Sequence, residues 1–383
     1  MKKYMKSYSL SLKTASPLFI GDGKSLNKKE YIYLRNQKKV LVPDIGKLYE
    51  GIWQKRLSRQ FTDYLLDGND RSGLEQWLRN NRIGPADYEK WTWYSLDGGD
   101  HLGEGKRPIE IATFIKDGYG LPYIPGTSIK GVLRNLLLIY EINRNPEICR
   151  SVKRSLPGSL QQTGSRKAYL KRDIEQIETT ILHTLNRIDK NGKELRKEDA
   201  VNDVLSGLIV SDSQPLKWTN MILCQKMDRS PNGTVNNNLN ILREAVKPGI
   251  VIPFQLTIDT TLCPYTIEDI QEAVKVFNDL YYSMYLEYFS DTDRPADDII
   301  WLGGGAGFLT KTILYPLLGH DEGLKAAIDV FDHTLPRSVN ERHKHYKDHQ
   351  AKVSPHMLKC TEYKGKMYQM GQCHLIVHSG GTV

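Results

Sequence analysis

Hydrophobic and polar positions along the chain change their period several times, and these changes predict separate elements. Residues 8–14 alternate between apolar and polar side chains, which is typical of a strand with one buried face. Two later apolar segments, 206–216 and 249–259, also indicate strands, the first with Asp212 at the end of its apolar run. Residues 221–242 resemble a hairpin whose tip is rich in turn formers, and the sequence QCHLIV near the C-terminus predicts a closing strand.

Helical patterns lie between these strands. A polar, Trp-rich segment at 47–93 and a charged segment at 166–205, broken at DKNGK, are expected to be helical. Residues 266–289 predict a long helix that begins with a Thr266/Asp269 capping box. Glycine-rich stretches at 96–108 and 303–307 are expected to be loops.

The order of these elements predicts an α+β chain with a ferredoxin-like β-α-β-β-α-β core, which is a common RNA-binding platform. We expect the core to span residues 1–314, with helical insertions at about 47–95 and 150–205 and a hairpin at about 221–242. Residues 315–383 form a basic, His-rich region. It either builds a second, degenerate domain or wraps around the first.

The stretch IPGTSIKGVLRNLLL contains the helix with the clearest signals. Thr127 or Ser128 is expected to be the N-cap, because a hydroxyl can accept a hydrogen bond from a free backbone amide. Lys130 and Arg134 lie four residues apart, away from the apolar stripe, with Gly131 between them. A helix start with hydroxyls and two cations is suited to bind phosphate, although a capped core helix with solvated cations explains the same pattern.

Two glycine-bearing segments add to this picture. IGDGKS is not a phosphate-binding P-loop, since Leu18 stands where the motif needs glycine, and it is expected to be a tight basic loop at a strand end. GGGAGF is not a dinucleotide fingerprint, since Phe308 replaces the last glycine. Consecutive glycines can form an anion nest, or they can mark a bulge or close packing. Together with the helix start, these segments predict binding sites for the phosphodiester backbone of RNA. The predicted RNA-binding residues are Gly21, Gly23, Lys24, Gly126, Thr127, Ser128, Lys130, Gly131, Arg134, Gly303, Gly304, Gly305, Gly307 and Lys311.

Charge and composition agree with an RNA partner without requiring one. The chain has 53 Lys and Arg against 45 Asp and Glu, a net charge of +8, and 39% hydrophobic residues. Five dispersed cysteines without a CxxC pair indicate reduced thiols rather than disulfides or zinc ligands. The N-terminus lacks a signal-peptide pattern, and no apolar run approaches the about 18 residues of a membrane span, so we expect a cytoplasmic protein.

Residues suited to catalysis or metal binding show no complete motif. His345 and His349 stand four apart but lack an HExxH pattern. The histidines are expected to lie in a cationic tail without a carboxylate or metal partner, which favours RNA contact or solvation over a metal site. Asp22, Asp44 and Asp212 belong to no paired-acid motif, and Asp212 is read as a turn residue. We therefore expect no catalytic residue, no metal and no cofactor, although a histidine-based ribonuclease remains an alternative.

Three stretches resemble a known family. YIPGTSIKGVLR is similar to the IPGSSIKG-type signature of the RAMP superfamily of CRISPR-associated proteins, and LGGGAGFLTK is similar to its C-terminal glycine-rich loop. TASPLFIGDGK followed by KKEYIY resembles one branch, the Csm-type subunit five of type III-A effector complexes. The resemblance runs from about Tyr8 to Lys311.

This resemblance implies a non-catalytic subunit that caps the 3′ end of CRISPR RNA (crRNA) and takes part in its maturation for antiviral and plasmid defence. It also implies contacts with target RNA, with backbone RAMP subunits and other Csm-type proteins, and with host trimming ribonucleases. The 221–242 hairpin matches the family's thumb. The acidic GGxDxPV loop of target-cutting paralogues is replaced by LVPDIGKLYEGIW, which contains Asp44 alone. The alternatives are a Cas6-like endoribonuclease and a scaffold that recruits trimming nucleases.

Overall fold

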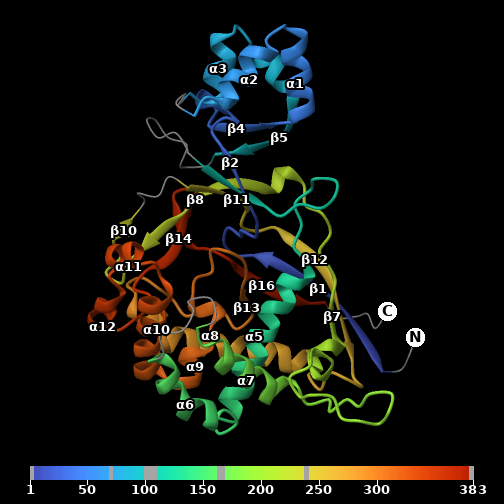
Figure 1. Ribbon diagram of the computed structural model, residues 1–383, viewed down its shortest axis with the longest axis vertical. Coiled ribbons are helices and arrows are strands. Elements are labelled where there is room, and N and C mark those ends of the chain that lie inside the picture. Colours follow the sequence, from blue (N-terminus) through green and yellow to red (C-terminus); the bar gives the residue numbers. More distant parts are fainter. Residues whose placement is uncertain (1–3, 69–71, 99–109, 162–168, 237–240, 379–383) are drawn as a thin grey trace.

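The structure, a computed structural model, describes residues 4–68, 72–98, 110–161, 169–236 and 241–378. Figure 1 shows a main body of strands and helices with a small lobe at one end. Most of the expected glycine-rich loop at 96–108, part of the hairpin tip and the start of the 166–205 segment lie outside the described residues. Across the described ranges, no helix is both long and apolar enough to cross a membrane.

A five-stranded antiparallel sheet forms the centre of the main body. Its strands lie in the order β13 (Ile299–Trp301), β16 (Gln372–Val377), β1 (Met5–Thr14), β12 (Val251–Asp259) and β7 (Leu208–Val210). Alternate β12 residues are buried, and they share a core with the apolar stripes of α5 (Gly126–Arg144) and α8 (Ile267–Met284). The capping box of Thr266 and Asp269 is present at the start of α8. These strands and the long helix confirm the sequence expectations.

The same sheet confirms the ferredoxin-like order. In sequence the core runs β1, α5, β7, β12, α8 and β16, and in space its strands lie β16-β1-β12-β7, with β13 added outside β16. The fourth core strand therefore comes from the region 315–383. Because β16 pairs with β1, this region completes the first sheet, and the described N- and C-terminal ends lie close together in Figure 1.

A seven-stranded sheet contains the predicted hairpin. Its order is β2 (Gly21–Asn27), β6 (Glu110–Phe114), β11 (Ile241–Val246), β8 (Met221–Gln225), β5 (Thr92–Asp97), β4 (Lys39–Pro43) and β3 (Ile32–Leu34). Strands β8 and β11 pair antiparallel in its middle. The tip strands β9 (Met227–Arg229) and β10 (Val235–Asn236) continue into a four-stranded sheet with β14 (Leu358–Tyr363) and β15 (Lys366–Gln369). The hairpin is thus built into two sheets rather than standing alone.

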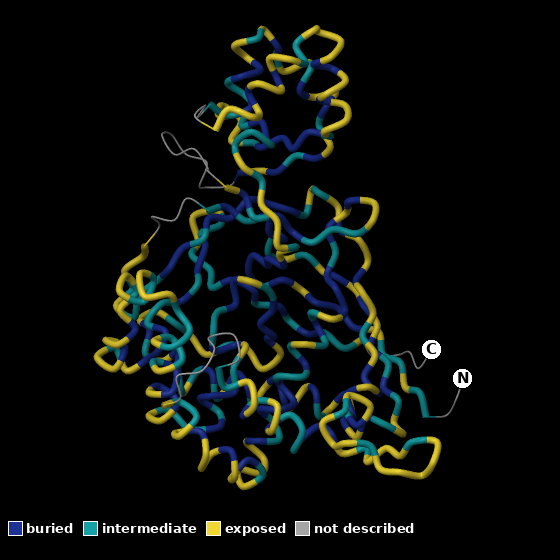
Figure 2. Tube along the Cα trace, viewed as in Figure 1, coloured by how far each residue is buried: buried dark blue, intermediate teal, exposed yellow. Residues whose placement is uncertain are grey.

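The first helical insertion forms the small lobe. It contains α1 (Ile45–Gln54), α2 (Ser58–Leu66), α3 (Leu74–Asn80) and α4 (Pro85–Trp91), which cover β3 and β4. Their apolar faces make a second core that includes Phe61, Trp77 and Trp91. Figure 2 shows buried segments in both the lobe and the main body. The expected helical character of this insertion is confirmed.

The second insertion is helical only in part. It contains α6 (Arg150–Leu160) and α7 (Lys171–Leu182), after which the chain turns at Asp189, whose carboxylate accepts hydrogen bonds from the amides of Asn191 and Lys193. The interruption expected at DKNGK is present, but the expectation of helix beyond it, up to Leu205, is wrong, because only the short 3-10 helices Ala200–Asn202 and Val204–Gly207 follow. The tail contributes α9 (Leu314–Leu318), α10 (His320–Thr334), α11 (Arg337–His343) and α12 (Asp348–Ala351).

Candidate nucleic-acid interface

Helix α5 begins two residues earlier than an N-cap at Thr127 would place it. Its first residue is Gly126, so Thr127 and Ser128 lie inside the first turn and the N-cap prediction for them is wrong. The Gly126 amide donates a 2.7 Å hydrogen bond to Oδ1 of Asp212, and a Cβ at Gly126 would lie 2.3 Å from the Val210 carbonyl oxygen. Gly126 is therefore needed for packing, and Asp212, read as a turn residue, supplies the acceptor for the helix start.

The two cations of α5 both interact with Asp203. Arg134 forms ion pairs with Asp203 (2.5 Å) and Glu178 (3.0 Å), which link α5 to the second insertion. Burial lowers the pKa of Lys130, and the nearby negative charge of Asp203 partly opposes this. The charge of Arg134 is thus already compensated within the protein. Phosphate binding by this pair stays a prediction.

A cavity of about 390 Å³ lies between α5 and the glycine-rich loop, and it brings together residues from two predicted motifs. A Cβ at Gly131 would meet no heavy atom within 4 Å, so this position opens onto free space and not onto another backbone of the chain. The cavity is lined by Ser128, Gly131, Val132, Arg134, Asn135, Leu138, Glu178, Leu302, Gly303, Thr310 and Lys311.

The glycine-rich loop packs closely against the protein itself. Gly303 has a φ of +85°, and a Cβ there would lie 2.1 Å from the carbonyl oxygen of Phe19. The amide of Gly304 donates to that same carbonyl at 2.7 Å, and a Cβ at Gly305 would lie 2.6 Å from that of Met370. Close packing, which was one of the two interpretations, therefore accounts for these glycines. Only Gly307, with a φ of +98°, has open space around it.

The segment around Gly21, Gly23 and Lys24 is a strand instead of the expected loop. It forms β2, which pairs with β6 and has an irregular register between Gly21 and Ser25. Oδ1 of Asp22 accepts a hydrogen bond from the Lys24 amide at 2.9 Å. Gly23 has a φ of +81° and no neighbouring atom, so it provides the left-handed turn within the irregular stretch. Lys24 is exposed and remains available to an anionic partner.

Lys311 was predicted from the sequence, but two further cations were not: Arg243 on β11, whose charge acts on Lys311, and Lys226, on which the charge of Arg243 also acts. Burial lowers the pKa of each of the three. The charges of Lys359 and Arg243 lower that of Lys226 further, and the charge of Arg243 does the same for Lys311, while Asp228 partly opposes the shifts of Lys226 and Arg243. Among the described residues, none of them forms an ion pair. The guanidinium of Arg243 lies 5.0 Å from the centre of the Phe19 ring. We name Lys226, Arg243 and Lys311 the cation cluster.

The sequence signal for this cluster was weak but present. Arg243 interrupts the otherwise largely apolar strand ILREAV, where a charged side chain needs a reason. Its neighbour Glu244 is fully buried and satisfied by Tyr94, Phe114 and Lys116, so it does not neutralise the cluster. The carboxylate that acts on Lys226 and Arg243 is Asp228, which is itself ion-paired with Lys359. A group of neighbouring cations that is only partly offset in this way is electrostatically suited to receive an anion.

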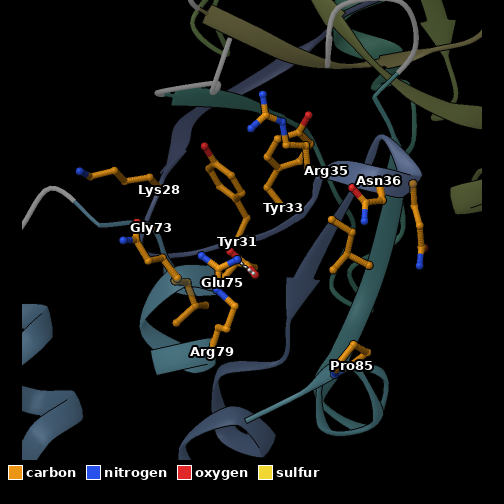
Figure 3. A pocket seen from close by; sticks show the side chains of 13 residues that line it. Lys28, Tyr31, Tyr33, Arg35, Asn36, Gly73, Glu75, Arg79 and Pro85 are labelled. Atoms are coloured by element: carbon orange, nitrogen blue, oxygen red, sulfur yellow. Dashed lines mark ion pairs between the residues drawn. The ribbon is translucent and has the colours of Figure 1, made fainter. Parts of the chain in front are cut away.

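A second cavity, of about 550 Å³, lies in the small lobe. Figure 3 shows Lys28, Tyr31, Tyr33, Arg35 and Arg79 around it. Aromatic rings next to cations are the groups that hold single-stranded nucleic acid, through base stacking and phosphate contacts. The motif KKEYIY had indicated only a family branch, and the fold adds that its side chains line a cavity.

The acids and histidines are arranged differently from the sequence expectation. Asp44 caps α1 through the Lys47 amide, and the exposed His349 contacts only the Tyr346 carbonyl oxygen. Asp348 binds both His345 and His356. The expectation of histidines without a carboxylate partner is therefore wrong, because Asp348 and His356 come close only in the fold.

The chain resembles proteins of CRISPR systems along nearly its whole length. The sequence profile of the RAMP superfamily matches residues 11–310. The "CRISPR system Cms protein Csm5" of Mycobacterium tuberculosis (strain CDC 1551 / Oshkosh) is 30% identical, covering 98% of this chain and 99% of its own. The protein of the same name from Streptococcus thermophilus is 28% identical, covering 82% of each chain.

Solved structures show the same fold. A chain in the cryo-EM structure of a Csm–crRNA–target RNA ternary complex of a type III-A CRISPR-Cas system matches with a TM-score of 0.62 and 20% identity, covering 96% of this chain and all of the other. The crystal structure of T. onnurineus Csm5 matches with a TM-score of 0.50 and 17% identity, covering 95% and 99%. From its sequence profile, its relatives and its fold, this chain belongs to the RAMP superfamily and, within it, to the Csm5 family.

Proposed function

We propose that the protein is a non-catalytic, RNA-binding subunit of a type III-A CRISPR (Csm) complex that caps the 3′ end of the crRNA. Its relatives are named as Csm5 proteins of CRISPR systems, and the matching chain of the cryo-EM structure belongs to a complex with crRNA and target RNA. Capping would support crRNA maturation and defence in the cytoplasm.

The cation cluster is the observation that carries this proposal. Bringing cations together is unfavourable, and Asp228, which is ion-paired with Lys359, offsets Lys226 and Arg243 only in part; a bound phosphate would lower this cost. Lys311 lines the cavity beside α5, and Arg243 lies near enough to lower the pKa of Lys311. A phosphodiester chain that enters this cavity would meet Lys311, on which the charge of Arg243 acts, and the bare backbone at Gly131.

These features suit the recognition of the RNA backbone rather than of its base sequence. The cluster and the cavity offer cations and backbone, which bind phosphates regardless of sequence, while base pairing between crRNA and target would read the sequence. The hairpin tip, which is described only in part, is paired with β14, and its role as a thumb in the guide–target duplex is part of the proposal.

We propose that the protein is not a nuclease, because the three candidate carboxylates already have structural hydrogen bonds. Asp22, Asp44 and Asp212 each accept a backbone hydrogen bond, so each has a structural task. Single Ala substitutions of these residues should leave the lengths of the crRNA unchanged. A general base or metal ligand would behave otherwise, since its loss typically costs about 10²-fold or more in rate.

Two experiments test the proposal and separate it from its alternatives. Purification of the tagged protein from cells should recover crRNA together with backbone subunits, and the association should depend on the cation cluster. Incubation of the pure protein with repeat RNA, with and without Mg²⁺, should give no cleavage. Cleavage would favour the endoribonuclease. Recovery of trimming ribonucleases after RNase treatment, without need for the cluster, would favour the scaffold.

A further inference from the structure

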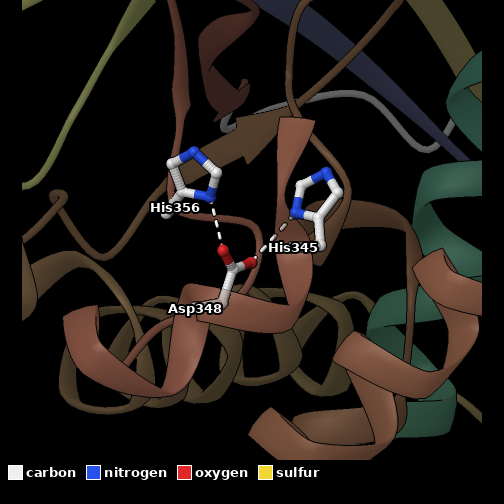
Figure 4. Close-up of side chains that lie close together, drawn as sticks. All are labelled: His345, Asp348 and His356. Carbon is white, nitrogen blue, oxygen red and sulfur yellow. Dashed lines mark hydrogen bonds and ion pairs between the residues drawn. The ribbon is translucent and has the colours of Figure 1, made fainter. Parts of the chain in front are cut away.

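Three side chains of the C-terminal region, none of which belongs to the cation cluster, lie close together in space. His345 lies in a 3-10 turn (His345–Lys347), Asp348 begins α12, and His356 lies just before β14. Figure 4 shows both imidazole rings turned toward the carboxylate. Nδ1 of His345 lies 3.0 Å from one Asp348 oxygen, and Nδ1 of His356 hydrogen-bonds to the other.

The carboxylate lies where a negative charge is expensive. Asp348 is 1% exposed and His345 is 6% exposed, while His356 is partly open to solvent. A buried carboxylate needs a compensating positive charge, and within the described ranges no Lys or Arg pairs with Asp348. The charge must come either from a protonated histidine or from a bound cation.

The geometry suits a cation. One ligand atom from each of the three residues lies within 4.8 Å of the others. In a tetrahedral zinc site with bonds of about 2.0–2.2 Å, ligand atoms lie about 3.4 Å apart. The hydrogen-bonded His and Asp atoms are already closer than this, so a small rearrangement that moves them apart around the ion would suffice. Two imidazole nitrogens with one carboxylate oxygen are a donor set that Zn²⁺ accepts readily, and the hard cations Mg²⁺ and Ca²⁺ prefer oxygen alone.

We propose that His345, Asp348 and His356 bind one divalent transition-metal ion of the zinc class. Water would fill the remaining position on the side where His356 is open to solvent. The ion would join α12 to the start of β14, and β14 in turn pairs with the hairpin strand β9. The site would thus be structural, and it is independent of RNA binding.

Metal uptake by the full-length protein tests this proposal. After incubation with Zn²⁺ and dialysis, elemental analysis should find about one equivalent in the wild-type protein, and the melting temperature should rise with added Zn²⁺. His356→Ala and Asp348→Asn should lose both effects. His349→Ala is the matched control, because this exposed histidine lies outside the site, and it should keep both effects.

A spectroscopic measurement on the wild-type protein tests the proposal even if one of the variants does not fold. Co²⁺ in place of Zn²⁺ should give the visible absorption of a tetrahedral site with nitrogen and oxygen ligands, and Zn²⁺ should displace it. A folded wild-type protein that takes up neither metal would overturn the proposal and leave protonated histidine as the compensating charge. Equal zinc uptake by the wild type and His356→Ala would also overturn it.

Discussion

Single residues around the cavity decide between packing and binding, and Gly131 is the clearest case. It lies inside α5, where glycine is less favourable than alanine by about 0.8–1 kcal/mol, and its Cβ position is empty. Gly131→Ala should therefore raise the free energy of unfolding by about 0.5–1 kcal/mol while weakening RNA binding, since the methyl group enters the cavity. Denaturant unfolding and RNA titration of the same preparation check both parts.

A contrasting substitution gives the control. At Gly305 a Cβ would collide with Met370, so Gly305→Val should lower the melting temperature whether or not RNA is present. If Gly131→Ala leaves RNA affinity unchanged, the cavity beside α5 does not hold RNA.

Lys311 predicts a pH dependence of RNA binding. Burial, aided by the charge of Arg243, lowers the pKa of Lys311 in the free protein, and a bound phosphate should raise it again. Protonation then favours the bound state, so affinity is full below the lowered pKa and falls as pH rises through it. Titration with an alkali-stable 2′-O-methyl oligonucleotide at increasing pH should show this fall.

Lys311→Arg is the matched comparison, because arginine keeps its charge throughout that range. This variant should lose less affinity at high pH than the wild type. Parallel pH profiles of the two proteins would exclude Lys311 as the titrating contact.

For single residues, the sequence predicted which residues matter better than it predicted what each of them does in the structure. The glycines of residues 303–305 and Gly126 were correctly singled out, but their reason is contact with distant backbone or side chains at Phe19, Met370 and Val210. A sequence pattern shows that a side chain is missing and not what fills the space. For the same reason, the sequence did not predict that Asp348 lies next to His356 or that Arg243 lies near Lys311.

At the scale of elements, buried polar contacts fasten the sheets together. Glu244 on β11 is fully buried and accepts hydrogen bonds from the Tyr94 hydroxyl on β5, the Phe114 amide on β6 and the Lys116 ammonium group. Glu244→Ala would leave Lys116 without its partner, so the free energy of unfolding should fall by about 3–5 kcal/mol. Denaturant unfolding measures this loss.

An exposed ion pair provides the comparison for Glu244. Arg337 pairs with Glu341 on α11 and is largely exposed, so Arg337→Ala should change the free energy of unfolding by about 0–1 kcal/mol. Similar small effects for both variants would mean that the Glu244 network does not hold the seven-stranded sheet together.

Elements with strong local signals were predicted well. Strands β1 and β12 alternate clearly, and α8 carries both an apolar stripe and a capping box, so local sequence alone determined them. The turn at Asp189 falls where a break was expected, but the prediction of helix beyond it was wrong, because the charged residues there resemble a helix only in composition. The predicted start of α5 was wrong because the group that accepts a hydrogen bond from its first amide, the Asp212 carboxylate, lies 86 residues away in the sequence.

At the scale of the whole molecule, the ferredoxin-like order was predictable because the core elements follow one another in that order. The arrangement of the tail was not, since β16 reaches its place beside β1 only through pairing across more than 350 residues. The same long-range pairing builds the seven-stranded sheet from segments between 21 and 246. It also places Arg243 of the hairpin next to Lys311 after the glycine-rich loop.

The central claim is that the cation cluster binds RNA phosphates, and the salt dependence of RNA affinity tests it most directly. In the double variant Arg243→Ala/Lys311→Ala, affinity for single-stranded RNA should fall for all sequences alike. The slope of log affinity against log salt should flatten by about 1.4, the value for two lost phosphate contacts on a single strand. Lys325→Ala, an exposed lysine on α10, should leave both unchanged. A folded double variant with the wild-type affinity and the wild-type salt slope would contradict the account.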